Sequence, residues 1–196
     1  MSTRVGIFGG TFDPVHNGHI SIVRSFIKSG LIDEMWILPS PSPPHKTDKE
    51  ITSFDHRKKM LELVFSNDEN IKISDIEEKL PLPSYTIHTL QYLKQKYPDN
   101  KFYLCIGGDS LADFKNWYRA EKIAGQTDLL VAERPEADGR DVSEKFLQNT
   151  QFVEHTPVNI SATEVRKELQ KNGEGLQDQV PPEVLQYIRD NGLYKN

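Results

Sequence analysis

Short apolar runs alternate with segments of helical spacing along the chain, and this alternation limits the fold more than any other feature of the sequence. The runs that predict strands are residues 4–8, 35–38, 71–73, 102–106, 129–132 and 151–153. The segments that predict helices are residues 18–29, 54–65, 85–97, 162–171 and 182–191. Strands that alternate with helices favour an α/β fold with a doubly wound, mostly parallel sheet flanked by helices.

The length of the chain is typical of one domain. Its 196 residues predict a single Rossmann-like domain over residues 1–196, with a small C-terminal helical part, about residues 161–192, packed on it. We expect Ser53 and Ser84 to cap the helices that follow them. Two segments are expected to be irregular: the proline-rich stretch 39–46, where prolines remove backbone donors, and a loop around residues 135–141.

The segment after the first predicted strand carries the strongest functional signal. The apolar run ends in Gly9 and Gly10, and His16 and His19 follow directly before or within the first predicted helix. Free backbone N–H groups and the positive end of the helix dipole favour anions at such a helix start. Two imidazoles beside glycines at this point therefore indicate a site that handles phosphate.

Polar side chains follow the other predicted strands as well, at the point where each strand ends. His45 and Lys46 follow the second strand, Asp109 the fourth and Arg134 the fifth. In doubly wound sheets, ligands bind beyond the carboxyl ends of the strands. The convergence of these groups with the two histidines predicts one binding site at that edge.

The histidine pair has three interpretations. His16 and His19 could bind a phosphate, cap the helix, or share a zinc ion whose third ligand would come from elsewhere, such as Asp13 or His45. Phosphate binding is favoured because a neutral imidazole still donates one hydrogen bond and an imidazolium also neutralises charge.

Three further positions have both a structural and a functional interpretation. Lys46 is either a solvated lysine or a phosphate contact at the mouth of the sheet. The segment from Ser161 through Thr163 to Arg166 is either a well-capped helix start or a second anion site. Trp117 is either a core residue or a platform on which a planar ligand stacks.

Composition excludes several classes of partner. The net charge of −5 lacks the basic footprint of proteins that bind nucleic acid polymers. No apolar run is long enough to cross a bilayer and no signal segment opens the chain, so we expect a cytoplasmic location. The single cysteine, Cys105, lies within an apolar run and is expected to be an inert core thiol.

Two motifs together resemble the HxGH nucleotidyltransferases. Residues 10–19 have the form G-x-F-D-P-x-H-x-G-H, and residues 160–166 have the form I-S-x-T-x-x-R. Four further blocks, residues 43–46, 84–86, 106–109 and 117–118, are similar in order to those of the bacterial nicotinate-nucleotide adenylyltransferases within that superfamily. The resemblance covers essentially the whole chain.

The resemblance implies adenylyl transfer from ATP to nicotinate mononucleotide, which gives deamido-NAD and pyrophosphate in NAD biosynthesis. The residues it assigns to catalysis are His16, His19, Lys46 and Arg166. Those it assigns to ATP are Gly9, Gly10, Thr11, Phe12, Gly107, Asp109, Arg134, Ser161 and Thr163. Those it assigns to nicotinate mononucleotide are Thr86, Trp117 and Tyr118, with the ring stacked on Trp117. His88 and Gly108 depart from the family pattern, which has an aspartate and commonly an alanine there.

The residue inventory favours a direct reaction. No serine, cysteine or lysine nucleophile is paired with a base, so we expect in-line displacement at the α-phosphorus, with Mg²⁺ brought by ATP and no metal site in the protein. Three rival functions stay open. They are a related transferase acting on phosphopantetheine or an alcohol phosphate, a nucleotide-binding protein without activity, and a zinc hydrolase.

Overall fold

The computed structural model describes residues 2–42, 51–133, 143–171, 173 and 175–195. Lys46 and Arg134, and the loop expected around residues 135–141, lie outside these ranges. Among the described residues no helix is both long and apolar enough to cross a membrane.

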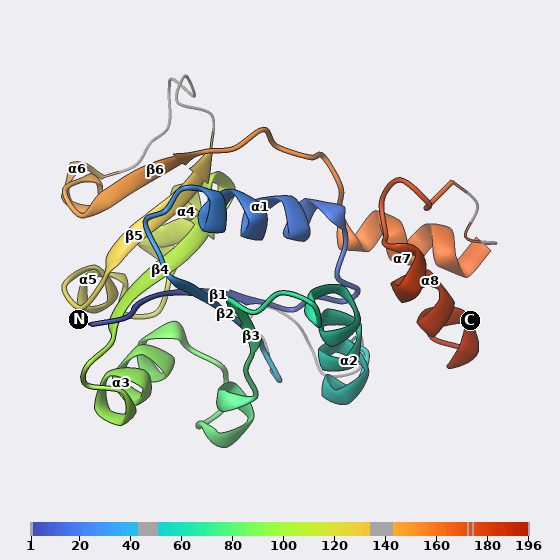
Figure 1. Ribbon diagram of the computed structural model, residues 1–196, viewed down its shortest axis with the longest axis horizontal. Coiled ribbons are helices and arrows are strands. Elements are labelled where there is room, and N and C mark those ends of the chain that lie inside the picture. Colours follow the sequence, from blue (N-terminus) through green and yellow to red (C-terminus); the bar gives the residue numbers. More distant parts are fainter. Residues whose placement is uncertain (1, 43–50, 134–142, 172, 174, 196) are drawn as a thin grey trace.

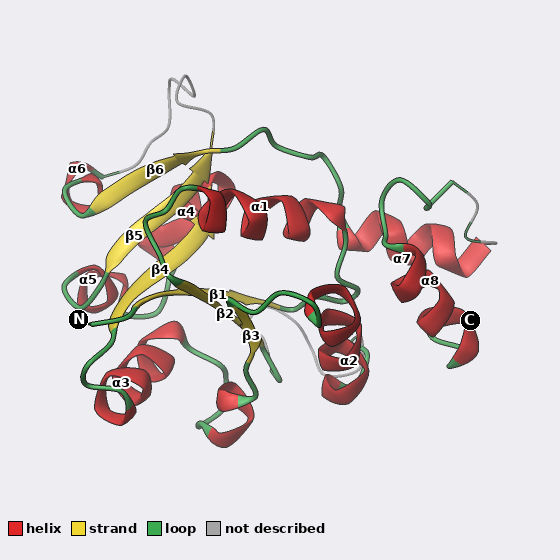
Figure 2. Ribbon diagram, in the orientation of Figure 1, coloured by secondary structure: helices red, strands yellow, loops and turns green. Residues whose placement is uncertain are grey.

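Six strands form one sheet in which every neighbouring pair is parallel (Figure 2). The strands are β1 (Arg4–Gly10), β2 (Glu34–Pro39), β3 (Ile71–Ile73), β4 (Lys101–Gly107), β5 (Asp128–Glu133) and β6 (Thr150–Glu154). Their order in the sheet is β3-β2-β1-β4-β5-β6. The strand predictions are confirmed, and most strands extend one or two residues beyond the apolar run because the ladder continues into flanking polar residues.

Helices cover both faces of the sheet. The longer ones are α1 (Asn17–Lys28), α2 (Phe54–Phe65), α3 (Thr86–Lys96), α7 (Ala162–Lys171) and α8 (Pro182–Asp190). The short ones are η2 (Ile76–Lys79), α4 (Gly108–Asp113), η3 (Phe114–Asn116), α5 (Ala120–Ala124) and α6 (Glu144–Leu147). The longer helices confirm the predicted segments. The short ones were not predicted, because three to six residues are too few to show helical periodicity.

Alternation along the strands separates two cores. Phe8, Tyr103 and Cys105 face a cluster completed by α1, α2, α7 and α8. Ile7 and Leu104 face the other cluster, completed by α3, α4, α5 and α6. Figure 1 shows α1 and α3 on opposite sides of the sheet. Helices on both faces of the parallel sheet confirm the prediction of a doubly wound fold.

Two local predictions were wrong. The residue at the cap of α3 is Tyr85 rather than Ser84, whose hydroxyl instead accepts from the Ser42 backbone N–H at 3.5 Å. Pro39, predicted to be irregular, is the last residue of β2 and is paired with Gly10. A proline is tolerated there because β3 pairs with β2 only as far as Ile37, so the missing N–H costs no ladder bond.

The strand order reverses at β1, which has β2 on one side and β4 on the other. The connection from β1 through α1 leads to β2, whereas β4 begins the other half of the sheet. Ligands in doubly wound sheets bind at the carboxyl ends of the strands at this reversal. The loop from Thr11 to His16 lies there.

Candidate active site

The two histidines of the opening motif form a stacked pair at the start of α1. His16 is the residue at the N-terminal cap of the helix, and its ring lies 3.7 Å from the His19 ring, centroid to centroid. The His16 backbone N–H donates to His19 Nδ1 at 3.3 Å, and the Phe12 ring packs edge-on against His19 at 5.0 Å. The His19 ring is therefore held in place on two sides.

The two histidines differ in exposure, because His16 is buried whereas His19 is half-buried. His16 is 6% exposed, and burial lowers its pKa from 6.5 to about 4. Its Nδ1 is buried without a hydrogen-bond partner within the described part of the chain. His16 is thus neutral at pH 7 and can act as a hydrogen-bond donor rather than as a cation.

The start of α7, which the sequence offered as a second anion site, lies against the loop between β1 and α1. The Arg166 guanidinium donates from Nη1 to the Asp13 carbonyl oxygen at 2.7 Å and from Nη2 to Thr163 Oγ1 at 3.3 Å. Figure 1 shows the start of α7 beside the start of α1. Ser161 precedes α7 and its carbonyl oxygen accepts from the Val165 N–H at 3.0 Å. Two helix starts, with the donors they expose, therefore face the same region.

Asp13 lies in the loop over residues 11–16, called the phosphate loop below after its predicted role, and joins it to the C-terminal part of the chain. Its carboxylate is 1% exposed and accepts from the Tyr194 hydroxyl at 2.6 Å and from the Thr52 backbone N–H at 3.4 Å. Burial and the Asp13 charge raise the pKa of Tyr194, so this phenol stays protonated and can donate. Sequence analysis considered Asp13 as part of the motif and as a possible zinc ligand, and nothing in the sequence pointed to Tyr194.

Arg57 is a second connecting residue that sequence reasoning missed. Its side chain is 1% exposed and donates to three backbone carbonyl oxygens: Thr11 at 2.7 Å, Thr52 at 2.8 Å and Ser40 at 2.9 Å. It thereby ties the loop after β1 to the end of β2 and the start of α2. An arginine on the buried face of α2, beside Met60 and Leu61, was the signal in the sequence.

A cavity of about 700 Å³ opens beside this loop. It brings together seven of the predicted site residues: Gly9, Gly10, Thr11, Thr86, Asp109, Trp117 and Tyr118. A volume of this size suits a small-molecule ligand. The walls also include apolar residues of β1 and β4, such as Ile7 and Leu104, so the cavity extends from the glycines into the core of the α3 side.

The glycines at the end of β1 shape this cavity differently. A Cβ on Gly9 would meet nothing within 4 Å, so this backbone borders open space. A Cβ on Gly10 would lie 2.8 Å from the Phe12 ring, closer than real contacts allow. Gly10 therefore permits Phe12, at a φ of 51°, to fold back and support His19.

Trp117 lies between the core and the cavity, so its position is compatible with either interpretation. It is half-buried and packs against Phe114 at 5.3 Å between ring centroids, yet it also lines the cavity. Tyr118 is 43% exposed and packs on Tyr85 with centroids 4.4 Å apart. His88, which replaces the family's aspartate, lies 6.2 Å from the Tyr118 ring, so the departure falls at this aromatic rim.

Gly107 and Asp109 stand where β4 turns into α4. Asp109 is exposed and lines the cavity, whereas Gly107 borders α1, since a Cβ on it would lie 3.8 Å from Ile22. Asp109 thus borders the cavity, whereas Gly107 lies next to α1, the helix whose start holds the two histidines.

Cys105 and two histidines outside the motif have structural surroundings. Cys105 is fully buried and burial raises the pKa of its thiol, which confirms the core prediction. His56 and His155 have structural partners, the Tyr187 hydroxyl at 2.8 Å and the Ser25 hydroxyl at 3.0 Å. Within the ranges that the structure describes, no three His, Cys, Asp or Glu side chains are grouped as metal ligands.

Three buried polar residues of the cavity lining were not predicted, and they are called the cavity floor below: Ser40, Glu77 and Thr89. Glu77 comes from η2 and accepts from Thr89 Oγ1 at 2.9 Å. η2 was missing from the prediction, whereas Thr89 lies within the predicted helix, so the missed element is the one that brings Glu77 to the cavity.

Comparison with known proteins shows the family to which the chain belongs. The cytidylyltransferase-like family matches residues 7–168. A probable nicotinate-nucleotide adenylyltransferase of Oceanobacillus iheyensis is 35% identical, over 97% of this chain and 96% of its own length. The nicotinate-nucleotide adenylyltransferase of Bacillus subtilis is 31% identical, over 98% of this chain and 99% of its own length.

A solved structure is similar over the same extent. Nicotinic acid mononucleotide adenylyltransferase of Plasmodium falciparum, complexed with NaAD, superposes with a TM-score of 0.80 and 23% identity. The match covers 98% of this chain and 97% of the Plasmodium chain. This likeness confirms the Rossmann-like α/β fold.

Proposed function

Because the chain belongs to the cytidylyltransferase-like family and is related over its full length to nicotinate-nucleotide adenylyltransferases, we propose that it makes deamido-NAD. It is a nucleotidyltransferase that transfers the adenylyl group of ATP to nicotinate mononucleotide and releases pyrophosphate, a step of NAD biosynthesis. The observation that carries the proposal is the cavity, which joins the glycines beside the histidine pair to Thr86, Trp117 and Tyr118.

The reaction is an in-line displacement. A phosphate oxygen of nicotinate mononucleotide forms a bond to the α-phosphorus of ATP, and the bond from that phosphorus to the bridging oxygen of the β-phosphate breaks. The leaving pyrophosphate carries the electron pair. Because the attacking oxygen is already anionic, the enzyme needs no strong base, and positioning with charge stabilisation supplies the catalysis.

We assign the phosphate contacts to the two helix starts. His19, held between Phe12 and His16, is the group nearest the α-phosphate, and neutral His16 donates a hydrogen bond beside it. Arg166, fixed by Asp13 and Thr163, meets the leaving pyrophosphate with its remaining donors, assisted by Ser161 and Lys46. Preorganised donors of this kind act most strongly where charge develops in the transition state.

The two ends of the cavity accept the two nucleosides. We assign Asp109 and the Gly107 backbone to the adenosine ribose and Arg134 to the adenine side. Trp117 gives the nicotinate ring a stacking surface, because it lines the cavity while Phe114 supports its other side. Backbone N–H groups near Thr86 and Tyr118 meet the ring carboxylate.

Mg²⁺ belongs to the substrate in this proposal. The cation prefers oxygen ligands, and ATP phosphates supply them. The buried Asp13 carboxylate already accepts from Tyr194 and Thr52, so it fits a supporting role better than a direct metal contact. When bound, the cation neutralises phosphate charge, while the residues above orient both substrates.

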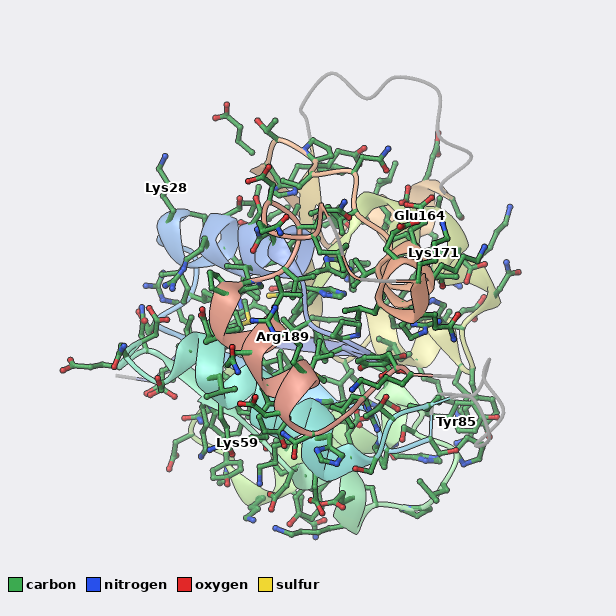
Figure 3. All side chains as sticks on the ribbon, turned by 90° about the vertical axis from the view of Figure 1, so that its right-hand side faces the viewer. Lys28, Lys59, Tyr85, Glu164, Lys171 and Arg189 are labelled. Carbon is green, nitrogen blue, oxygen red and sulfur yellow. The ribbon has the colours of Figure 1, made fainter. Side chains whose placement is uncertain are left out.

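We also propose that residues 1–196 act as one domain. Val165 of α7 and Val184 of α8 share a core cluster with Val23 of α1, and Arg166 reaches the phosphate loop. Figure 3 looks onto these two helices, with Lys171 of α7 and Arg189 of α8 labelled. In this proposal they contribute to the site through Arg166. A cytoplasmic location stays a sequence-based prediction.

Pyrophosphate release with ATP and a panel of acceptors tests the function. We expect turnover with nicotinate mononucleotide and slower turnover or none with phosphopantetheine and alcohol phosphates. The product should have the mass of deamido-NAD. ATP binding with no product from nicotinate mononucleotide would refute the proposal and revive the non-catalytic alternative.

A further inference from the structure

The floor of the cavity carries a carboxyl group that the proposed reaction does not use. Glu77 is 8% exposed, lines the cavity, and accepts from Thr89 Oγ1 at 2.9 Å. Thr89 is 2% exposed, so the hydrogen bond fixes the carboxyl group from the core side. Acidic side chains are almost never this buried unless they are paired with a cation, and Thr89 is neutral.

A second polar group shares that floor. Ser40 is 8% exposed, it lines the same cavity, and its Oγ has no hydrogen-bond partner in the described ranges. A buried hydroxyl without a partner costs free energy that a bound ligand or water recovers. Ser40 and Glu77 are thus two buried polar residues of the cavity lining, and of these two only the Ser40 hydroxyl is unsatisfied among the described residues.

We propose that Glu77 is a specificity-determining residue of the mononucleotide pocket, whose carboxyl group discriminates between pyridine mononucleotides by the charge of their ring substituent. This inference rests on the proposed function. The neutral carboxyl group tolerates the nicotinate carboxylate, whereas the ionised group repels it. The nicotinamide ring substituent is neutral and does not feel this repulsion.

The surroundings of Glu77 keep its carboxyl group neutral over an unusual range. Burial raises its pKa from 4.5 to about 7, although the bond from Thr89 opposes the shift. On its own element, Asp75 pairs with Lys79 at 3.1 Å and with Lys58 of α2 at 4.0 Å, and Glu78 is exposed. Neither lysine is thus placed to neutralise Glu77.

Other titratable side chains also face this cavity or its rim. They are Asp109 and Asp113 of α4, Tyr85 and His88 at the start of α3, and Tyr118 after η3. These groups are unchanged when Glu77 is replaced. Their contribution is therefore common to the wild type and a Glu77 variant.

The size of the cavity sets the expected effect. A sphere of this volume is roughly 11 Å across, so any ring inside lies within reach of the Glu77 charge. Two like charges about 8 Å apart at an effective dielectric constant of about 20, with screening, change binding by roughly tenfold.

The test follows the pH dependence of binding for two mononucleotides in one assay. The KM for nicotinate mononucleotide and the inhibition constant of nicotinamide mononucleotide are measured from pH 6 to 8.5 for the wild type, Glu77→Gln and Glu78→Gln. The quantity compared is the ratio of the KM for nicotinate mononucleotide to the inhibition constant of nicotinamide mononucleotide. Both ligands share the phosphate and ribose, so effects of pH on phosphate binding cancel in this ratio. Glu78→Gln removes the same charge from the exposed neighbouring residue.

We expect the ratio to rise roughly tenfold with pH in the wild type and in Glu78→Gln, and to stay flat in Glu77→Gln. A flat wild-type ratio, which needs no variant to fold, overturns the proposal. A rising ratio in Glu77→Gln also overturns it. If the wild type fails to turn over nicotinate mononucleotide at every pH, the proposed function itself is wrong, and this inference falls with it.

Discussion

The Tyr194→Phe variant tests whether the C-terminal segment holds the phosphate loop. The substitution removes only the hydroxyl that donates to Asp13 Oδ1 at 2.6 Å and keeps the ring. Asp13 is 1% exposed, so its carboxylate oxygen would lose a partner away from solvent. A hydrogen bond to a charged group contributes about 1.5–3 kcal/mol, and at about 2–4 °C per kcal/mol for a chain of this length the loss lowers the Tm by about 3–12 °C.

The kinetic effect follows from the other contacts of Asp13. Its carbonyl oxygen accepts from Arg166, and its carboxylate accepts from the Thr52 N–H, so a shift of this loop moves a phosphate-binding group. We expect kcat to fall about tenfold, because small misplacements of reacting groups are costly. The KM for the mononucleotide should change little, since Tyr194 lies outside the cavity lining.

Tyr187→Phe is the matched control. It removes a hydroxyl that lies 2.8 Å from His56 Nδ1, in the same C-terminal part of the chain but away from the loop. Thermal unfolding and steady-state kinetics of both variants are compared at pH 7. Equal loss of kcat in the two variants, or a Tyr194→Phe variant with wild-type kcat and Tm, would refute the reasoning.

Three further outcomes follow from the site. His19→Ala should lower kcat at least ~10²-fold with the fold intact by circular dichroism, whereas near-normal turnover would remove His19 from the mechanism. Gly10→Ala should lose about 1–3 kcal/mol in chemical denaturation because its Cβ meets Phe12 at 2.8 Å, whereas Gly9→Ala should unfold like the wild type. Neutral His16 contributes stability that is complete above pH 6.5 and is lost as pH falls toward 4; the loss is about 3 kcal/mol. Denaturation midpoints at pH 7 and 5 should differ less in His16→Asn than in the wild type, and equal pH dependence in both would contradict this origin.

The central strands β1, β2, β4 and β5 were predictable because each is a run of buried, mostly apolar residues. Runs such as residues 102–106 are bounded by polar or glycine residues, so strand type and length were both evident. Helices of nine residues or more were found by their periodicity and their caps. The short elements between β3 and β5 lacked both signals, and tertiary packing alone fixes them.

Candidate site residues could be named from the sequence where one short motif carries several of them. His16 and His19 belong to such a motif, and so do Thr163 and Arg166. Glu77, Arg57 and Tyr194 were not predicted, because the contact that characterises each one is with a residue outside its own segment. Arg57 reaches the Thr11 carbonyl 46 residues away, and Tyr194 reaches Asp13 across 181 residues.

The bond between Tyr194 and Asp13 makes the site unequally tolerant of changes in chain length. The entropy of closing a flexible loop grows only with the logarithm of its length, by about 0.6 kcal/mol per doubling. Residues inserted at exposed turns between positions 13 and 194 should therefore disturb this contact little. Deleting residues 194–196 removes the donor altogether, so three residues at the end of the sequence matter more to the phosphate loop than a much longer insertion on the surface.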